Sequence, residues 1–171
     1  MNSKEQNLFD AVDAVQKAFF DLTGNQDAFN YNRLGEVMSS IQLGLDWNSG
    51  FTGADAYDNE GNPVELKSTT QKRIQGTYNG LSKFDRHEEF VEYIQQKYPD
   101  NTRHIFTRKE QGKIVEAYEL PNNVVLDIIL TKTGKINKFW DENGYWCYSG
   151  KDPRVGCSVS MTEVKQGVQL I

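Results

Sequence analysis

The sequence predicts an α/β fold in which a central mixed β-sheet, containing one tight hairpin, is flanked by α-helices. Three observations favour this class. Apolar residues recur at helical spacing before residue 45, a turn-forming cluster separates two strand-like segments after residue 51, and further helical and strand-like segments follow. The 171 residues suffice for one hydrophobic core but not for two. We therefore expect a single domain spanning residues 1–171.

Three segments carry the helical pattern. From Glu5 to Leu22 the apolar residues recur on one face, and Gly24 is expected to end this helix. Arg33 to Leu43 repeats the pattern, and Arg86 to Tyr98 does so again before Pro99 stops it. These segments would supply the helices that cover the sheet.

Strand-like segments follow the third helical segment. His104–Thr107 and Lys113–Leu120 are predicted strands, joined by a turn at Gln111–Gly112. Residues 121–140 fit two structures, because their Val-Val-Leu-Asp-Ile-Ile-Leu run suits a strand whereas Pro121 suits a helix start. Short strands are expected between Tyr145 and Ile171.

Composition argues against several classes of protein. No apolar run approaches the roughly 18 residues of a membrane-spanning helix, and the first residues lack an apolar signal region. Cys147 and Cys157 show no metal-ligand spacing, so a reducing, cytoplasmic location is expected. With only His87 and His104 in the chain, neither a zinc site nor a histidine-based nuclease motif is expected.

The most informative segment is an acid followed ten residues later by a Glu-x-Lys triplet. Residues 58–63, Asp-Asn-Glu-Gly-Asn-Pro, form a turn signal between Asp55 and Glu65. In a hairpin, Glu65 and Lys67 would point to one face and Asp55 would fold back beside them. Two carboxylates suit a hard divalent cation, and an adjacent ammonium suits metal-assisted phosphodiester hydrolysis. The alternative is an ordinary surface pair, since hairpin strands often carry exposed Glu and Lys.

The motif resembles a known family of nucleases. Gly53-x-Asp55-Ala56-x-Asp58-Asn59-x-Gly61 with Glu65-Leu66-Lys67-Ser68 is similar to the core of the PvuII-type restriction endonucleases, a branch of the PD-(D/E)xK superfamily. Ile105–Phe106 with Gly112–Leu120 resembles the strand pair that follows, and Trp146–Val168 resembles the C-terminal part. The resemblance implies a restriction-endonuclease-like core, and it favours helix for residues 121–140.

The resemblance also implies an activity and a cofactor. The expected protein is a type II restriction endonuclease, a hydrolase that cuts double-stranded DNA at a short palindrome. Mg²⁺ would be held by Asp55, Glu65 and the Leu66 carbonyl, while Lys67 would orient the attacking water. The family has a further polar group just before the Gly-x-Asp motif, and this chain has Thr52 there. Whether one or two metal ions act is left open.

Charge distribution and polar composition indicate where DNA would lie. The net charge is −5, yet residues 65–86 carry five basic residues against two acidic ones, so phosphate contacts are expected there. The family's histidine cluster in this region is replaced by Gly80, Leu81 and Ser82, which implies a different target sequence. The expected DNA-binding residues are Asn30, Asn32, Lys72, Arg73, Tyr78, Asn79, Ser82, Lys83, Lys151, Asp152 and Arg154.

A palindromic target implies a homodimer, because two sites must follow the two-fold axis of the DNA. Residues 1–45 are the expected dimer contact, 51–120 the catalytic core and 121–171 a DNA-recognition part. A cognate DNA methyltransferase in the same bacterial or phage-encoded system is left open, with no direct contact implied. Two alternatives stand beside this interpretation: a structure-selective nuclease of repair, recombination or phage DNA processing with the same fold, and a non-catalytic DNA-binding protein.

Overall fold

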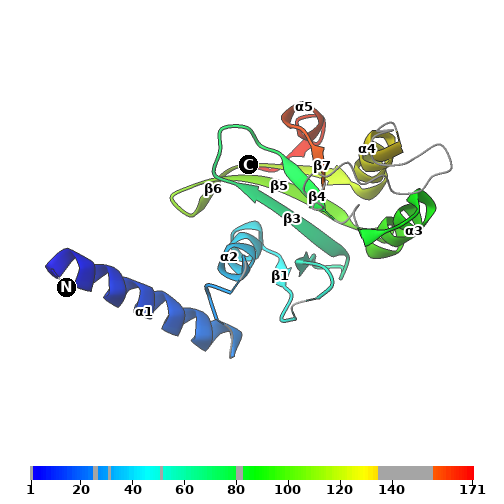
Figure 1. Cartoon of the computed structure of the whole chain (residues 1–171). Coiled ribbons are helices and arrows are strands. Elements are labelled where there is room, and N and C mark those ends of the chain that lie inside the picture. Colours follow the sequence, from blue (N-terminus) through cyan, green and yellow to red (C-terminus); the bar gives the residue numbers. More distant parts are fainter. Residues whose placement is uncertain (1, 25–26, 31, 51, 80–82, 135–155) are drawn as a thin grey trace.

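The computed structural model describes residues 2–24, 27–30, 32–50, 52–79, 83–134 and 156–171. Over these residues the chain is a mixed α/β structure in which helices flank a largely antiparallel sheet (Figure 1). The expected α/β class is confirmed at this level. Across the same ranges, no helix combines the length and the apolar character needed to cross a membrane.

The two N-terminal helices form where the apolar spacing predicts them. Helix α1 spans Ser3–Thr23 and begins at Asn2, whose side chain and that of Glu5 form a reciprocal capping box. Helix α2 spans Arg33–Leu43. Gly24 and Gly44 end these helices with positive φ angles of 73° and 68°, a conformation that glycine adopts without steric cost.

Three further helices lie beyond the hairpin. Helix α3 spans His87–Lys97, α4 spans Asn122–Gly134, and the short α5 spans Met161–Val164. Residues 122–134 are therefore helical, as the resemblance implied, and Val125 and Ile129 of α4 are fully buried. Residues 135–140 of that expected helix fall outside the described residues. Pro121 is the last residue of a strand rather than the first of the helix.

The main sheet has six strands in the order β1-β2-β3-β5-β6-β8. All neighbouring pairs are antiparallel except β3 and β5, which are parallel because α3 provides the crossover between them. The strands are β1 Asp46–Trp47, β2 Ala56–Tyr57, β3 Pro63–Thr69, β5 Arg103–Glu110, β6 Lys113–Pro121 and β8 Val168–Gln169.

A second, two-stranded sheet pairs β4, Gly76–Asn79, with β7, Gly156–Val159. It lies close to β3, since a Cβ added to Gly76 would meet Phe106 Cε1 at 2.6 Å and Lys67 Cγ at 2.7 Å. Only glycine fits this approach. The segment between β3 and α3, which carries many of the expected DNA-binding residues, therefore contains a strand.

The two faces of the main sheet bury separate apolar clusters. Phe106 of β5 belongs to the larger cluster, with α3, α4, β4 and β7, whereas Ile105 packs with Val64 and Leu66 near the end of α2. Glu65 is the register partner of His104 in the parallel pair β3–β5. Side chains alternate along β3, so Glu65 and Lys67 point toward the larger cluster.

The hairpin between β2 and β3 is confirmed, with Ala56 opposite Val64. Asp58 organises its turn: Oδ1 accepts the backbone N–H groups of Glu60 and Asn62 at 3.0 and 2.9 Å. Its Oδ2 accepts Asn62 Nδ2 and Arg103 Nη1, each at 3.1 Å. Gly61 supplies the positive φ of 81°. One carboxylate thus ties the turn to β5.

The Asp58 carboxylate should make the stability of the fold depend on acid pH. The hydrogen bond from the Asn62 side chain, with those from backbone N–H groups and Arg103, lowers the pKa of Asp58 to about 2. The stabilisation is therefore complete above the ordinary carboxyl pKa of about 4 and is lost as pH falls toward 2.

Asp58→Asn should unfold at lower urea concentration than the wild type at pH 7, with the gap closing between pH 4 and pH 2. Asp100→Asn, at an exposed loop carboxylate, is the control. Equal urea midpoints for Asp58→Asn and Asp100→Asn at pH 7 would contradict this account.

Candidate active site

The hairpin brings Asp55 alongside the Glu-x-Lys triplet. The Asp55 N–H donates to the Val64 carbonyl at 3.1 Å, and Asp55 Oδ2 accepts the Leu66 N–H at 2.7 Å. On β3, Lys67 Nζ lies 2.5 Å from Glu65 Oε1. The geometry thus gathers Asp55, Glu65 and Lys67 at the open end of the β2–β3 pair.

The two carboxylates differ in their electrostatic environment. Burial, and then the nearby charge of Glu65, raises the pKa of Asp55 to about 7. Burial also acts to raise the pKa of Glu65, but the charge and hydrogen bond of Lys67 lower it below its usual value. The charge of Lys67 also acts on Asp55, but burial and Glu65 outweigh it there, so Asp55 is the less compensated of the two carboxylates.

This donor set suits a divalent cation. Two carboxylates that repel each other are oxygen ligands of the kind that Mg²⁺ prefers, and a cation would remove the repulsion. Among the described residues, no three Asp, Glu, His or Cys side chains converge closely enough to form a metal site by themselves. Any cation at Asp55 and Glu65 would thus depend on backbone, water or substrate oxygens for its other ligands.

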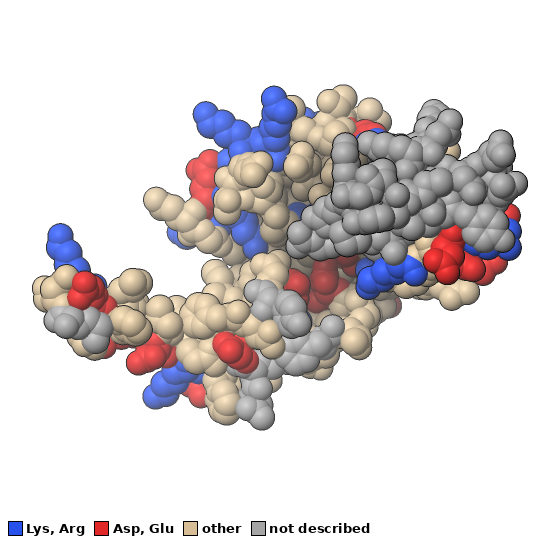
Figure 2. Space-filling model, viewed as in Figure 1, with Lys and Arg blue, Asp and Glu red and all other residues tan. Residues whose placement is uncertain are grey.

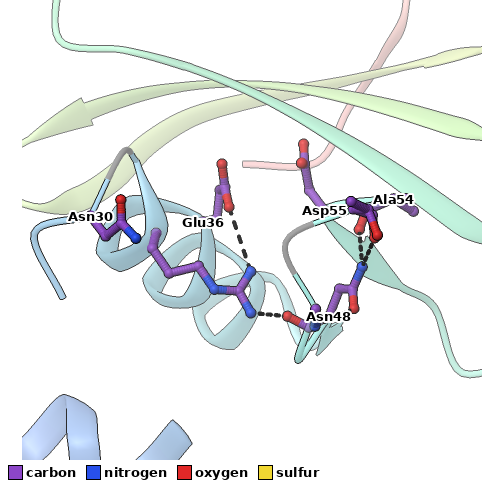
Figure 3. A pocket seen from close by; sticks show the side chains of 9 residues that line it. Asn30, Glu36, Asn48, Ala54 and Asp55 are labelled. Carbon is purple, nitrogen blue, oxygen red and sulfur yellow. Dashed lines mark hydrogen bonds and ion pairs between the residues drawn. The ribbon is translucent and has the colours of Figure 1, made fainter. Parts of the chain in front are cut away.

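A cavity of about 350 Å³ opens beside Asp55. Figure 3 shows Glu36, from α2, and Asp55, from the segment before β2, pointing toward the same space. Arg33, which forms a 3.6 Å ion pair with Glu36, donates to the Asn48 carbonyl, and Asn48 Nδ2 donates to the Ala54 carbonyl at 2.7 Å. These bonds hold the segment that carries Asp55 against α2.

Glu36 is a site residue that sequence reasoning missed. It lines the same cavity as Asp55, and its charge also acts to raise the pKa of Asp55. In the sequence it is an ordinary polar residue of an amphipathic helix, so only the docking of α2 against the hairpin reveals it.

A second cavity, of about 530 Å³, lies at the Glu65 side of the hairpin. It shares Gly53 and Ala54 with the first cavity and is also lined by Tyr93, Lys97 and Tyr98. The site therefore stands between two hollows. Figure 2 shows acidic side chains in the hollow at the centre of this face and basic side chains along its upper edge.

Several of the expected DNA-binding residues line cavities or are exposed. Asn30 lines the Asp55 cavity, and Asn32, at the start of α2, lines a separate cavity with residues 68–71. Lys72 and Arg73 are exposed in the loop between β3 and β4, and Lys83 is exposed before α3.

Tyr78 does not fit a role in base contact. Its side chain is 4% exposed, and its hydroxyl bonds to buried His104 Nδ1 at 2.8 Å. The alternation of β4 turns it into the core, so this expectation is corrected. Asn79 lies in β4 by its backbone. The remaining expected contacts fall outside the described residues: Ser82, Lys151, Asp152 and Arg154.

No protein-family model matches this chain, and no curated protein matches it.

Neutralising Asp55 should stabilise the protein in the absence of divalent cations. Because the pKa of Asp55 is raised, its ionised form costs stability as pH rises from about 4 through about 7. Asp55→Asn keeps an acceptor for the Leu66 N–H but removes the charge. In EDTA at pH 8 its melting temperature should exceed the wild-type value by several degrees, with the gain shrinking toward pH 4.

Millimolar Ca²⁺ should raise the wild-type melting temperature more than that of Asp55→Asn. Asp46→Asn, at an exposed residue of β1, controls for net charge. A lower melting temperature for Asp55→Asn at pH 8 would show that no such repulsion exists.

Proposed function

We propose that this protein is a Mg²⁺-dependent nuclease that hydrolyses phosphodiester bonds of double-stranded DNA, as a type II restriction endonuclease of the PvuII kind. One observation carries the proposal: Asp55 and Glu65 sit on adjoining segments of one hairpin, with Lys67 beside Glu65. The mixed sheet with flanking helices is compatible with the nuclease core that the motif resembles.

Asp55, Glu65 and the Leu66 carbonyl would hold the metal ion. When bound, Mg²⁺ supplies Lewis acidity that lowers the pKa of a water molecule and offsets negative charge on the leaving oxygen. Glu36 adds a third carboxylate to the wall of the Asp55 cavity. Its contribution would be to attract a cation into that cavity.

Lys67 would act on the attacking water and on the phosphate. Its ammonium is anchored at 2.5 Å from Glu65 Oε1, with its side chain 21% exposed. From there it would hold and polarise a water molecule and offset the negative charge that grows on the phosphate in the transition state. A lysine without the Glu65 contact could swing freely, so the pair fixes where this charge lies.

Exposed lysine and arginine side chains between β3 and α3 would contact the DNA backbone. Lys72 and Arg73 follow β3 directly, and Lys83 lies before α3. Basic side chains at phosphates position a duplex without reading its sequence.

The apolar face of α1 supports a homodimer. Leu8, Val12, Val15, Phe19 and Leu22 recur at alternating spacings of four and three, the pattern of a helix–helix seam. The helix extends away from the rest of the chain (Figure 1), and within this seam only Phe19 is buried. Leu8 and Leu22 are 64% and 52% exposed. The α1 helix of a second copy of the chain would cover these residues, and that copy would supply a second active site for the other DNA strand.

Removing the proposed catalytic groups should abolish cleavage without abolishing DNA binding. Glu65→Ala and Lys67→Ala should each lower the rate of Mg²⁺-dependent plasmid cleavage by at least about 100-fold, because each removes a group that acts on the transition state. Both variants should still bind DNA in Ca²⁺ buffer in a gel-shift assay. Glu60→Ala and Lys113→Ala, exposed in the hairpin turn and at the start of β6, are matched controls.

The cleavage products separate the candidate activities. Discrete fragments from plasmid and phage DNA support a site-specific endonuclease, whereas a smear or cutting only at junctions supports the structure-selective alternative. Full activity of Glu65→Ala or Lys67→Ala would refute the assignment. Absence of cutting by the wild type, with DNA binding retained, would support a non-catalytic DNA-binding protein.

Charges placed in the α1 seam should dissociate the dimer. Leu8→Glu combined with Val15→Glu would bury two carboxylates per chain in an apolar contact, at a cost of several kcal/mol. We expect this variant to be monomeric in analytical ultracentrifugation at tens of micromolar, where the wild type is dimeric. Lys17→Glu introduces the same residue outside the seam and should remain dimeric. A monomeric wild type at these concentrations would overturn the dimer proposal.

A further inference from the structure

Behind the candidate active site lies a closed ring of polar contacts that includes Glu65 and Lys67. Tyr98 Oη donates to Glu65 Oε1 at 3.2 Å, the oxygen that Lys67 also holds. Asn122 Nδ2 donates to the Tyr98 carbonyl at 2.9 Å, and Asn122 Oδ1 lies 3.0 Å from His104 Nε2. The remaining contacts involve Tyr78, whose hydroxyl lies 2.8 Å from His104 Nδ1 and whose ring centre lies 4.9 Å from Lys67 Nζ.

The hydrogen bonds define the protonation of His104. Asn122 uses its Nδ2 as a donor to Tyr98, so the atom facing His104 Nε2 is the acceptor Oδ1. His104 therefore carries its proton on Nε2, and its Nδ1 accepts the Tyr78 hydroxyl proton. Burial lowers the pKa of His104, in keeping with a neutral ring. Each of the three hydrogen bonds thus has a defined donor and a defined acceptor.

The ring joins five parts of the fold. Glu65 and Lys67 come from β3 and Tyr78 from β4; the other members, Tyr98, His104 and Asn122, come from the end of α3, from β5 and from the start of α4. The aromatic members also touch edge to face, with Tyr98 and His104 centroids 5.0 Å apart and Tyr78 and Tyr98 centroids 5.9 Å apart. The three aromatic members and Asn122 are each no more than 4% exposed.

The consequence for Glu65 is a fixed orientation. Both of its hydrogen bonds, from Lys67 and from Tyr98, reach Oε1. Within the described residues, Oε2 has no hydrogen-bond donor and is the oxygen left to take a ligand. The Lys67 ammonium lies over the aromatic ring of Tyr78, which attracts it through a cation–π contact. The ring thus restrains both reactive groups from behind.

We propose that Tyr78, Tyr98, His104 and Asn122 are positioning residues that set Glu65 Oε2 and the Lys67 ammonium in their working orientation, with His104 as the member that links the two tyrosine arms. This inference rests on the proposed function for its kinetic consequence, but its geometry can be tested without any activity. Outer groups that orient ligands and reactive side chains typically change activity by roughly 10–100-fold when removed.

The first arm of the test reads the His104 tautomer by ¹⁵N NMR of the full chain. The chain has only two histidines, so His87→Gln assigns the signals of His104. We expect a protonated Nε2 and an unprotonated Nδ1 in the wild type. Tyr78→Phe should shift the Nδ1 resonance, because it removes the hydroxyl that donates a hydrogen bond to Nδ1. Tyr118→Phe, which removes a buried hydroxyl bonded to Glu116 instead, should leave it unchanged. An Nδ1-protonated His104 would overturn the inference.

The second arm measures steady-state cleavage of a DNA substrate in Mg²⁺. Tyr98→Phe and Tyr78→Phe should each lower kcat by roughly 10-fold or more with little change in KM, because they disturb the reacting groups and not the DNA-binding surface. Tyr118→Phe should keep the wild-type kcat. A raised KM with unchanged kcat, or wild-type kinetics in both ring variants, would refute the positioning role. If the wild type does not cut DNA while His104 has the expected tautomer and response, the proposed function fails and the ring geometry stands.

Discussion

The burial of the Glu65 carboxylate is the constraint on which the surrounding structure depends. A carboxylate that is only 7% exposed costs several kcal/mol unless it is paired and hydrogen-bonded. Lys67 provides the pairing and Tyr98 the hydrogen bond, which requires α3 to end beside β3. The Tyr78 ring can reach Lys67 only because Gly76 lets β4 approach β3 closely. The end of α3 and the close approach of β4 thus supply the groups that compensate one buried charge.

Much of this arrangement follows from local sequence signals. The apolar periodicity predicts α1, α2 and α3, and the turn cluster around Asp58 predicts the β2–β3 hairpin. The hairpin in turn fixes the pairing of Asp55 with the Glu-x-Lys triplet, because a slip of one residue would turn Glu65 to the opposite face of the sheet. These features depend on contacts between residues near each other in the sequence, which is why the chain displays them directly.

The remaining features depend on contacts between distant residues. Tyr78 is drawn into the core because β4 pairs with β7, about eighty residues later, so its polar neighbours in the sequence gave a misleading signal. Glu36 reaches the Asp55 cavity only through the docking of α2. His104 is a buried packing residue, and its bonds to Tyr78 and Asn122 also make it part of the support behind the site. Residue type and spacing do not encode such long-range partners.

The charges around the site impose an order on the proposed reaction. Glu36 and Asp55 face one cavity and Glu65 the next, so the site by itself would repel a phosphate group. The exposed Lys72, Arg73 and Lys83 lie outside these cavities and can hold the DNA backbone at a distance, but they do not cancel the acidic lining. A phosphate can approach Lys67 closely only when a cation balances the carboxylates, because like charges in a partly buried site are weakly screened. In the proposed reaction, general DNA affinity would therefore reside in the basic surface, while the close contact needed for cleavage would require the metal ion.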